Sequence, residues 1–116
     1  MRRGYLIAYN RTRGRELAAR VLKAEDAASR SRGLLGRSSL EASEGLWIVP
    51  CPMIHTFFMK FAIDALFLDR GNKVVRVVSD LKPWRLSPWV FSAHSVLELA
   101  SGAARGTAAG DQLDFR

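Results

Sequence analysis

Short apolar runs bounded by turn residues recur along most of the chain, a pattern typical of β-strands. Residues 5–9 form the first run, and residues 10–14 carry the residue types expected in the turn that follows. Strands are also predicted at residues 45–49, 95–100 and 112–115. The pattern therefore predicts a β-rich protein.

The clearest prediction is a β-hairpin between residues 65 and 78. Its two apolar runs, 65–68 and 74–78, are joined by Asp69-Arg70-Gly71-Asn72, in which Gly and Asn accept a positive φ. A long surface loop is predicted over residues 81–91, which contain Pro83, Trp84, Pro88 and Trp89.

Residues 54–61 alternate between two faces and predict another strand. One face would carry His55, Phe57, Met59 and Phe61, and the other would carry Thr56, Phe58 and Lys60. Pro50 and Pro52 exclude a continuous helix through Cys51, so the chain is expected to be extended there.

Residues 17–24 fit two structures. Leu17, Val21, Leu22 and Ala24 have helical spacing, yet Val21-Leu22 also suits a short strand that precedes a helix. That helix is predicted to begin after an N-cap at Asp26 and to end at Gly33 or Gly36.

Length and composition are typical of one globular domain over residues 1–116. Of the 116 residues, 48% are apolar and 25% are charged, and no apolar run approaches the roughly 20 residues that span a bilayer. The apolar stretch after Arg2 and Arg3 is too short for a secretory signal, and the single cysteine excludes an internal disulfide. We therefore expect a cytoplasmic protein with no membrane partner.

The net charge of +7 is concentrated in the N-terminal third of the chain. Residues 1–37 hold ten Lys and Arg against three acidic residues, whereas residues 38–116 hold eight of each. Such a segment suits a phosphate-rich or acidic partner only if its cations share one surface. It also lacks an aromatic residue between Tyr9 and Trp47, so no platform for stacking bases is predicted there.

Several motifs in the chain resemble those of a known family. In order they are Arg32-Gly33-Leu34-Leu35-Gly36-Arg37, Glu44-Gly45-Leu46-Trp47, Phe58-Met59-Lys60, Ile63-Asp64 with Phe67-Leu68-Asp69, Val96-Leu97-Glu98-Leu99 with Gly102, and Gly110-Asp111. Over about residues 17–115 they resemble the bacterial and archaeal family called domain of unknown function 192.

The resemblance implies a mainly β fold, a compact β-barrel or sandwich-like single domain with one short helix. It also favours a strand near residues 20–24 over the helical alternative. It implies no established activity. Many relatives carry Asn-Thr and a Pro after the Met-Lys pair, whereas Phe61-Ala62 stand here, so a role of those polar residues does not carry over.

Cys51 and His55 are suited either to nucleophilic catalysis or to metal binding. In an extended chain their Cα atoms would lie about 13 Å apart, from roughly 3.3 Å per residue, which is too far for one metal ion or one hydrogen bond. A turn at Pro52 could restore contact. We expect no metal and no cofactor, and Cys51 is interpreted as a small buried apolar residue.

Asp64 interrupts an apolar stretch, where an unpaired carboxylate would be costly, so it is expected to have a partner. That partner could be a set of backbone N–H groups, Lys60 or an arginine of the 32–37 segment. A functional alternative gathers His55, Lys60, Asp64, Arg32 and Arg37 around a small polar pocket. Trp84 and Trp89 could close over that pocket or cap the core.

These observations favour a ligand- or peptide-binding accessory module with an unknown small ligand or peptide as partner. One alternative is an enzyme of unknown reaction that uses His55 and Asp64 as acid and base. The chain has no phosphate-binding glycine loop and no serine nucleophile motif. A further alternative is weak binding of nucleic acid or an acidic partner through the basic N-terminal segment.

Overall fold

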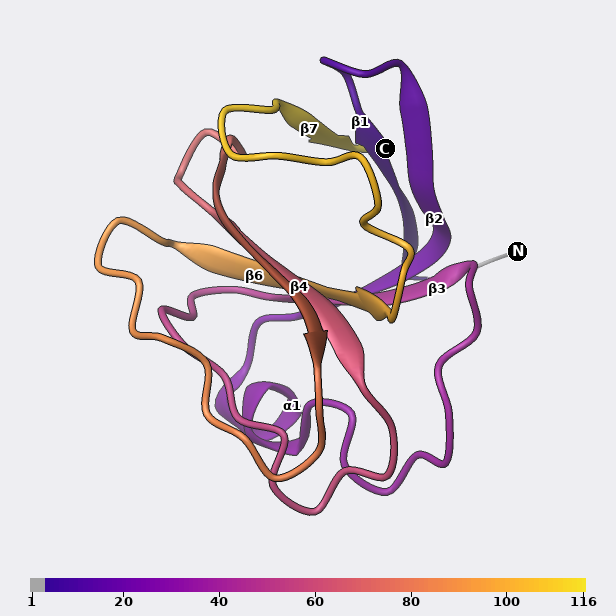
Figure 1. The fold of residues 1–116 in the computed structure, drawn as a ribbon, viewed down its shortest axis with the longest axis vertical. Coiled ribbons are helices and arrows are strands. Elements are labelled where there is room, and N and C mark those ends of the chain that lie inside the picture. The colour runs from indigo at the N-terminus through magenta and orange to yellow at the C-terminus, as the bar shows by residue number, and fades with distance from the viewer. Residues whose placement is uncertain (1–3) are drawn as a thin grey trace.

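The computed structural model describes residues 4–116 as seven strands and one short helix (Figure 1). Arg2 and Arg3 of the basic N-terminal segment lie outside the described residues. The elements are β1 Tyr5–Asn10, β2 Arg15–Ala24, α1 Ala27–Arg32, β3 Glu44–Ile48, β4 Ile63–Leu68, β5 Val74–Leu81, β6 Ser95–Ala100 and β7 Leu113–Phe115. No helix in this range is long and apolar enough to cross a membrane.

The strands form one curled sheet in the order β5-β4-β6-β3-β2-β1-β7. The β2–β3 pair is parallel and the other pairs are antiparallel. The two ends of the sheet approach each other where Lys73 pairs with Gln112 and the Val74 amide donates to the Asp111 carbonyl at 2.8 Å. Figure 1 shows the resulting half-barrel. The prediction of a mainly β fold with one short helix is confirmed.

The curled sheet has a core on each of its faces. The inner core fills the half-barrel and includes Leu66, Leu68, Leu97 and Leu99. The outer core lies on the opposite face, beneath the segment after α1 and the loop before β4, and includes Phe67 and Val96. Because successive side chains of a strand point to opposite faces, β4 and β6 supply both cores in alternation. This explains why every residue of β4 is buried.

Gly45 allows three strands to pack closely at the centre of the sheet. A Cβ at this position would lie 3.0 Å from Leu99 Cδ2 and 3.2 Å from the Glu98 carbonyl oxygen, with Val21 Cγ2 at 3.3 Å. These distances are shorter than ordinary van der Waals contact, so a side chain here would push β3 away from its neighbours. Close packing therefore gives the Glu44-Gly45-Leu46-Trp47 motif a structural role.

Most of the predicted elements are present. The 65–78 hairpin forms, residues 82–94 follow β5 as an irregular loop, and residues 17–24 belong to a strand. The helix begins after Asp26, whose side chain accepts a hydrogen bond from the Ser29 amide at 2.8 Å, and it ends at Gly33 with φ of 49°. The turn residues at 69–72 explain the hairpin and the capping chemistry explains the helix, whereas the strand at residues 17–24 agrees with the family resemblance.

The predicted strand at residues 54–61 is wrong. This segment is an irregular loop in which only His55 makes an isolated bridge, to Leu86. A turn reverses the chain where the Met59 amide donates to the Thr56 carbonyl, and Phe58 has a φ of 67°. A left-handed residue is incompatible with a continuous strand, and its cause is tertiary: the Thr56 backbone bonds to residues 84 and 85 instead of to a sheet.

Asp64 is buried, with 2% of its surface exposed, and its carboxylate is fully occupied by backbone donors. One oxygen accepts from the Asp80 amide at 2.9 Å, and the other accepts from the Gly102 and Ala104 amides at 2.9 and 3.0 Å. The expected partner is therefore the backbone, from β5 and the loop after β6. Asp64 ties this loop to the end of the half-barrel.

We expect Asp64→Ala to lower the free energy of unfolding by about 1–3 kcal/mol, because three backbone amides, one of them buried and two partly buried, lose their acceptor. Asp64→Asn should also be destabilised, since its NH2 group would face one set of N–H donors. Asp114→Ala is the control: this carboxylate lies in exposed ion pairs with Arg11 and Arg116, so its loss should cost well under about 1 kcal/mol. Urea denaturation of the three variants checks this. An Asp64→Ala protein as stable as the wild type would contradict the assignment.

Candidate functional site

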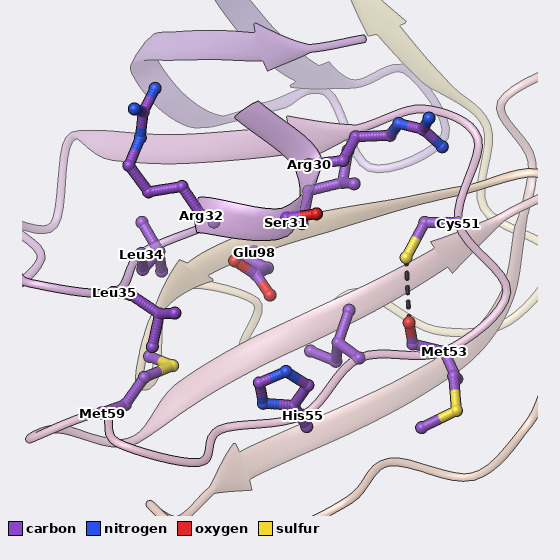
Figure 2. A pocket seen from close by; sticks show the side chains of 13 residues that line it. Arg30, Ser31, Arg32, Leu34, Leu35, Cys51, Met53, His55, Met59 and Glu98 are labelled. Carbon is purple, nitrogen blue, oxygen red and sulfur yellow. Dashed lines mark hydrogen bonds between the residues drawn. The ribbon is translucent and has the colours of Figure 1, made fainter. Parts of the chain in front are cut away.

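A small cavity lies between the outer face of the sheet and the segment that follows α1 (Figure 2). Its volume is about 130 Å³. Apolar and sulfur-containing side chains form most of the wall: Leu34, Leu35, Ile48, Cys51, Met53, Ile54 and Met59. Polar side chains are few, and among them His55 and Glu98 come from different parts of the chain. A mostly apolar hollow with few polar groups is typical of small-ligand sites.

Glu98 is the unusual group in this cavity. It pairs with Ala65 of β4 and lies on the same face of the sheet, which is the face of the outer core. Only 3% of its surface is exposed, and within residues 4–116 its Oε1 has no hydrogen-bond partner. Burial raises the pKa of Glu98 from 4.5 to about 8. Burial therefore favours the neutral, protonated carboxyl group, whose O–H is a hydrogen-bond donor.

His55 borders the same cavity from the loop before β4 and is, unlike Glu98, an exposed residue. The Phe57 amide donates to His55 Nδ1 at 3.2 Å, which leaves Nε2 as the ring atom available for another partner. With Nδ1 as acceptor, the neutral ring carries its proton on Nε2. Figure 2 shows the His55 ring on the opposite side of the cavity from Glu98. The cavity therefore combines two hydrogen-bond donors with an apolar wall.

The loop that carries His55 is fixed by hydrogen bonds to the loop after β5. The Thr56 hydroxyl donates to the Lys82 carbonyl and accepts from the Arg85 amide at 2.9 Å. The buried Ser87 hydroxyl accepts from the Ile54 amide at 2.9 Å. These bonds hold the cavity wall in place without a regular strand.

Arg30 and Arg32 line the cavity, but Figure 2 shows their guanidinium groups pointing away from Glu98. Arg30 instead donates to the carbonyl oxygens of Asp26 and Pro50, both at 3.4 Å. The arginines thus add positive charge near the cavity without pairing with its buried carboxyl group.

The structure brings together only part of the predicted pocket. His55 and Arg32 line the cavity, whereas Asp64 lies on the opposite face of the sheet, beside a separate hollow with Asp80 and Ser101. Strand alternation explains the separation, because Asp64 shares the parity of Leu66 and not that of Ala65.

The remaining candidates are also elsewhere. Lys60 is exposed, and Arg37 pairs with Glu44 at 2.7 Å beside a second, larger hollow of about 340 Å³. That hollow contains no buried polar atom without a partner, within the described part of the chain. Trp84 packs against Phe57 and Phe58, and Trp89 packs against Phe91, so the tryptophans cover neither hollow.

Glu98 belongs to one of the motifs that carry the family resemblance, but it is not among the site residues predicted from the sequence. The sequence feature that predicts burial of Asp64, an acidic residue within an apolar run, is also found at Glu98, which interrupts Val96-Leu97-Glu98-Leu99. The two buried acidic side chains differ in their surroundings: three backbone amides donate to Asp64, whereas Glu98 Oε1 has no hydrogen-bond partner within the described residues.

Half of the ten cations in the basic N-terminal segment, residues 1–37, are in ion pairs within the described part of the chain. Five of its cations form ion pairs: Arg11 with Asp114, Arg13 with Asp111, Arg20 with Glu41, Lys23 with Glu25 and Arg37 with Glu44. The bond from Arg13 is the largest contribution that lowers the pKa of Asp111 to about 2. The charge asymmetry in the sequence is therefore reduced in the fold, because four of these cations meet acidic residues from the second part of the chain, while Lys23 pairs with Glu25 of the segment itself.

Metal ligands are not gathered at the cavity. Across residues 4–116, no three His, Cys, Asp or Glu side chains are arranged to hold a metal ion. Cys51 is half-buried and not fully buried as the sequence predicted, and its thiol donates to the Met53 carbonyl at 2.9 Å. Burial, the largest influence, raises the pKa of this thiol.

We expect Cys51 to react slowly with thiol reagents at neutral pH, because partial burial raises its pKa and favours the protonated, less nucleophilic form. Cys51→Ala should retain the fold, with a loss of about 1 kcal/mol from reduced packing. Labelling of the native protein with a chromogenic disulfide reagent, compared with the unfolded protein in urea, measures this. Equal rates in the two states would contradict the assignment.

Solved structures support the same fold. A protein of unknown function from Novosphingobium aromaticivorans matches with a TM-score of 0.82 and 22% identity, over 94% of this chain and 83% of the other. A protein from Sinorhizobium meliloti, described as a candidate transcription regulator, also matches with a TM-score of 0.82, at 20% identity, over 99% of this chain and 98% of the other. At these identities the likeness establishes the fold alone.

Sequence relatives point to one family. A UPF0127 protein of Thermococcus sibiricus is 32% identical over 116 residues, covering 91% of this chain and 72% of its own length. A UPF0127 protein of Pyrococcus furiosus is 30% identical over 113 residues, covering 91% of this chain and 95% of its own. The family model DUF192, described as Uncharacterized ACR, matches residues 8–115. The chain therefore belongs to the DUF192 family.

Proposed function

We propose that this protein is a binding module that holds a small, largely apolar ligand in the cavity beside Glu98. The observation that carries the proposal is the buried Glu98 Oε1 without a partner, in the wall of a hollow of about 130 Å³. Leaving such a group unsatisfied costs about 1–3 kcal/mol, so a folded protein rarely retains one without a compensating role. A bound ligand would supply the missing partner.

The chemistry of the cavity favours a ligand with an acceptor oxygen. Protonated Glu98 offers an O–H group, and His55 Nε2 offers an N–H group. The guanidinium groups of Arg30 and Arg32 lie nearby and disfavour an ammonium group. A carboxylate or carbonyl compound therefore fits better than an amine.

The dimensions of the cavity limit the rest of the ligand. A buried apolar cavity of about 150 Å³ is known to hold a molecule the size of benzene. The hollow beside Glu98 is slightly smaller and is lined by Leu34, Ile48 and Ile54. A short aliphatic chain of about four carbons is consistent with this volume and lining.

The alternative of an enzyme that pairs His55 with Asp64 has less support. The two Asp64 oxygens already accept three backbone hydrogen bonds, and Asp64 borders a different hollow from His55. An acid–base pair needs both groups within reach of one substrate. Binding at the Glu98 cavity requires no such pair.

We expect butyrate and butanamide to bind in this cavity, with dissociation constants in the millimolar range for so few atoms. n-Butylamine has the same chain length and should bind at least about tenfold more weakly, because it places a cation beside the arginines. Methyl NMR shifts of Ile48, Ile54 and Met59 measure binding at the cavity, with Val77 of β5 as an internal reference.

The matched variant is Glu98→Leu, which removes the hydrogen-bonding group and keeps an apolar side chain. It should weaken butyrate binding by about tenfold or more, whereas Leu22→Ala, on the surface outside this cavity, should leave it unchanged. Absence of methyl shifts with all three probes at 20 mM would count against a ligand site of this chemistry. Equal butyrate binding by Glu98→Leu and the wild type would show that Glu98 is not part of the ligand site.

Stability should depend on pH through Glu98. Its pKa is higher in the folded protein, about 8, than the ordinary 4.5, so unfolding releases a proton between these values and stability falls as pH rises from 4.5 to 8. Glu98→Gln removes this dependence. The variant should be about 3 kcal/mol more stable than the wild type at pH 7 and about equal to it at pH 4.

Urea denaturation at the two pH values tests this expectation. Thr107→Val is the matched control, since buried Thr107 accepts a hydrogen bond from Asn10 at 3.1 Å and its replacement should lower stability at both pH values. A Glu98→Gln protein less stable than the wild type at pH 7 would mean that Glu98 has a stabilising partner.

A further inference from the structure

The loop before β4 and the loop after β5 form a fixed pair on the side of the molecule away from the 69–72 hairpin turn (Figure 1). Backbone hydrogen bonds run along the pair, from the Thr56 amide to the Arg85 carbonyl, from the Ser87 amide to the Ile54 carbonyl, and from the Val90 amide to the Pro52 carbonyl. The two loops therefore present their side chains from a defined backbone.

These loops expose a series of large apolar side chains, which we call the aromatic strip. Its members and their exposed fractions are Phe58 70%, Trp84 55%, Leu86 59%, Trp89 54% and Phe91 90%. Phe58 and Trp84 are in contact with ring centroids 4.7 Å apart, and Trp89 and Phe91 form a second pair at 6.1 Å. Clustered exposed apolar side chains are characteristic of an interaction surface.

Two members of the strip are held in an unfavourable backbone conformation. Phe58 has a φ of 67° and Trp84 a φ of 65°, a region that bulky L-residues rarely occupy. The conformation directs both aromatic side chains to the surface, where they gain little from packing against the core. Strained residues that surrounding structure maintains are concentrated at functional sites.

The loops that carry the strip contain cations but no acidic residue. Residues 49–62 and 82–94 contain Lys60, Lys82 and Arg85 and lack Asp and Glu. Lys60 and Arg85 are exposed, while Lys82 pairs with Asp80 of β5 at 2.6 Å. The surface therefore combines aromatic side chains with positive charge, which complements an anionic partner.

We propose that the aromatic strip attaches this protein to the surface of an anionic lipid bilayer. Trp and Phe side chains locate at the boundary between lipid headgroups and acyl chains, and neighbouring Lys and Arg are attracted to anionic headgroups. Leu86 fits this environment too, since an aliphatic side chain partitions into lipid.

A single-stranded nucleic acid fits the strip less well. Bases stack on open aromatic faces, whereas Phe58 and Trp84 pack against each other at 57° and the intervening Leu86 offers no ring. A second copy of the chain is also less favoured, because the exposed cations of the loops would face one another without acidic partners.

This proposal concerns attachment to a membrane surface and is independent of the ligand cavity. The sequence expectation of no membrane partner rested on the absence of an apolar run long enough to span a bilayer. Surface attachment needs no such run, because a few aromatic side chains and cations suffice for reversible binding.

Co-sedimentation with vesicles tests the proposal on the full chain. Vesicles of phosphatidylcholine with 30% phosphatidylglycerol should bind the protein at least about tenfold more strongly than vesicles of phosphatidylcholine alone, and added salt should weaken binding. Brominated lipids should quench the emission of Trp84 and Trp89. Trp47, which stacks on Phe115 at 3.7 Å, should be unaffected.

Paired variants separate the two contributions. Phe58→Ala with Trp84→Ala should reduce binding by at least about tenfold, as should Lys60→Glu with Arg85→Glu. The control Arg70→Glu reverses an exposed charge in the distant hairpin turn and should bind within about twofold of the wild type. Thermal unfolding followed by circular dichroism confirms that each variant is folded.

Three results would overturn the proposal. The first is no sedimentation with anionic vesicles at 0.1 M salt together with no quenching by brominated lipids. The second is unchanged binding after the Phe58 and Trp84 substitutions. The third is a wild-type protein that ignores vesicles but binds a fluorescent oligothymidine with sub-micromolar affinity, or that forms a dimer lost in the same double variant, which would assign the strip to those partners.

Discussion

Burial of the central strands on both faces is the constraint on which the other features of this fold depend. The sheet curls around the inner core, so the outer faces of β4 and β6 need a separate cover, which the segment after α1 and the loop before β4 provide. Any polar side chain on these two strands is removed from water on whichever face it occupies. The free-energy cost of burying such a side chain then depends on which backbone or side-chain groups lie within hydrogen-bond distance of it.

Asp64 and Glu98 show the two outcomes of this constraint. They lie on neighbouring strands and interrupt equally apolar sequences, yet they face opposite sides of the sheet. On the inner side the loop after β6 brings amides to Asp64, and the carboxylate becomes part of the framework. On the outer side Glu98 meets a cavity, and burial raises its pKa instead. Asp64 therefore has a structural role, whereas Glu98 is the buried polar group that the proposed ligand would contact.

The irregular loops before β4 and after β5 contribute to both proposals in different ways. Their inward side chains, such as Ile54 and Met59, complete the outer core and the cavity wall. Their outward side chains form the aromatic strip. Because Thr56 and Ser87 fix the loops through side-chain hydrogen bonds, the loops have a defined shape without belonging to the sheet.

Local chemistry in the sequence determined most of the secondary structure. The 69–72 turn, the Asp26 cap, the end of the helix at Gly33 and the runs that became β1, β3, β4, β5 and β6 depend on neighbouring residues, so they were predictable. The buried position of Asp64 also followed from the apolar residues beside it. Tertiary structure decided the rest. The alternation at residues 54–61 predicted a strand, but hydrogen bonds to a distant loop produced a turn instead. Which of two similar carboxylates would be satisfied depended on long-range packing, because the amides that reach Asp64 come from residues 80, 102 and 104.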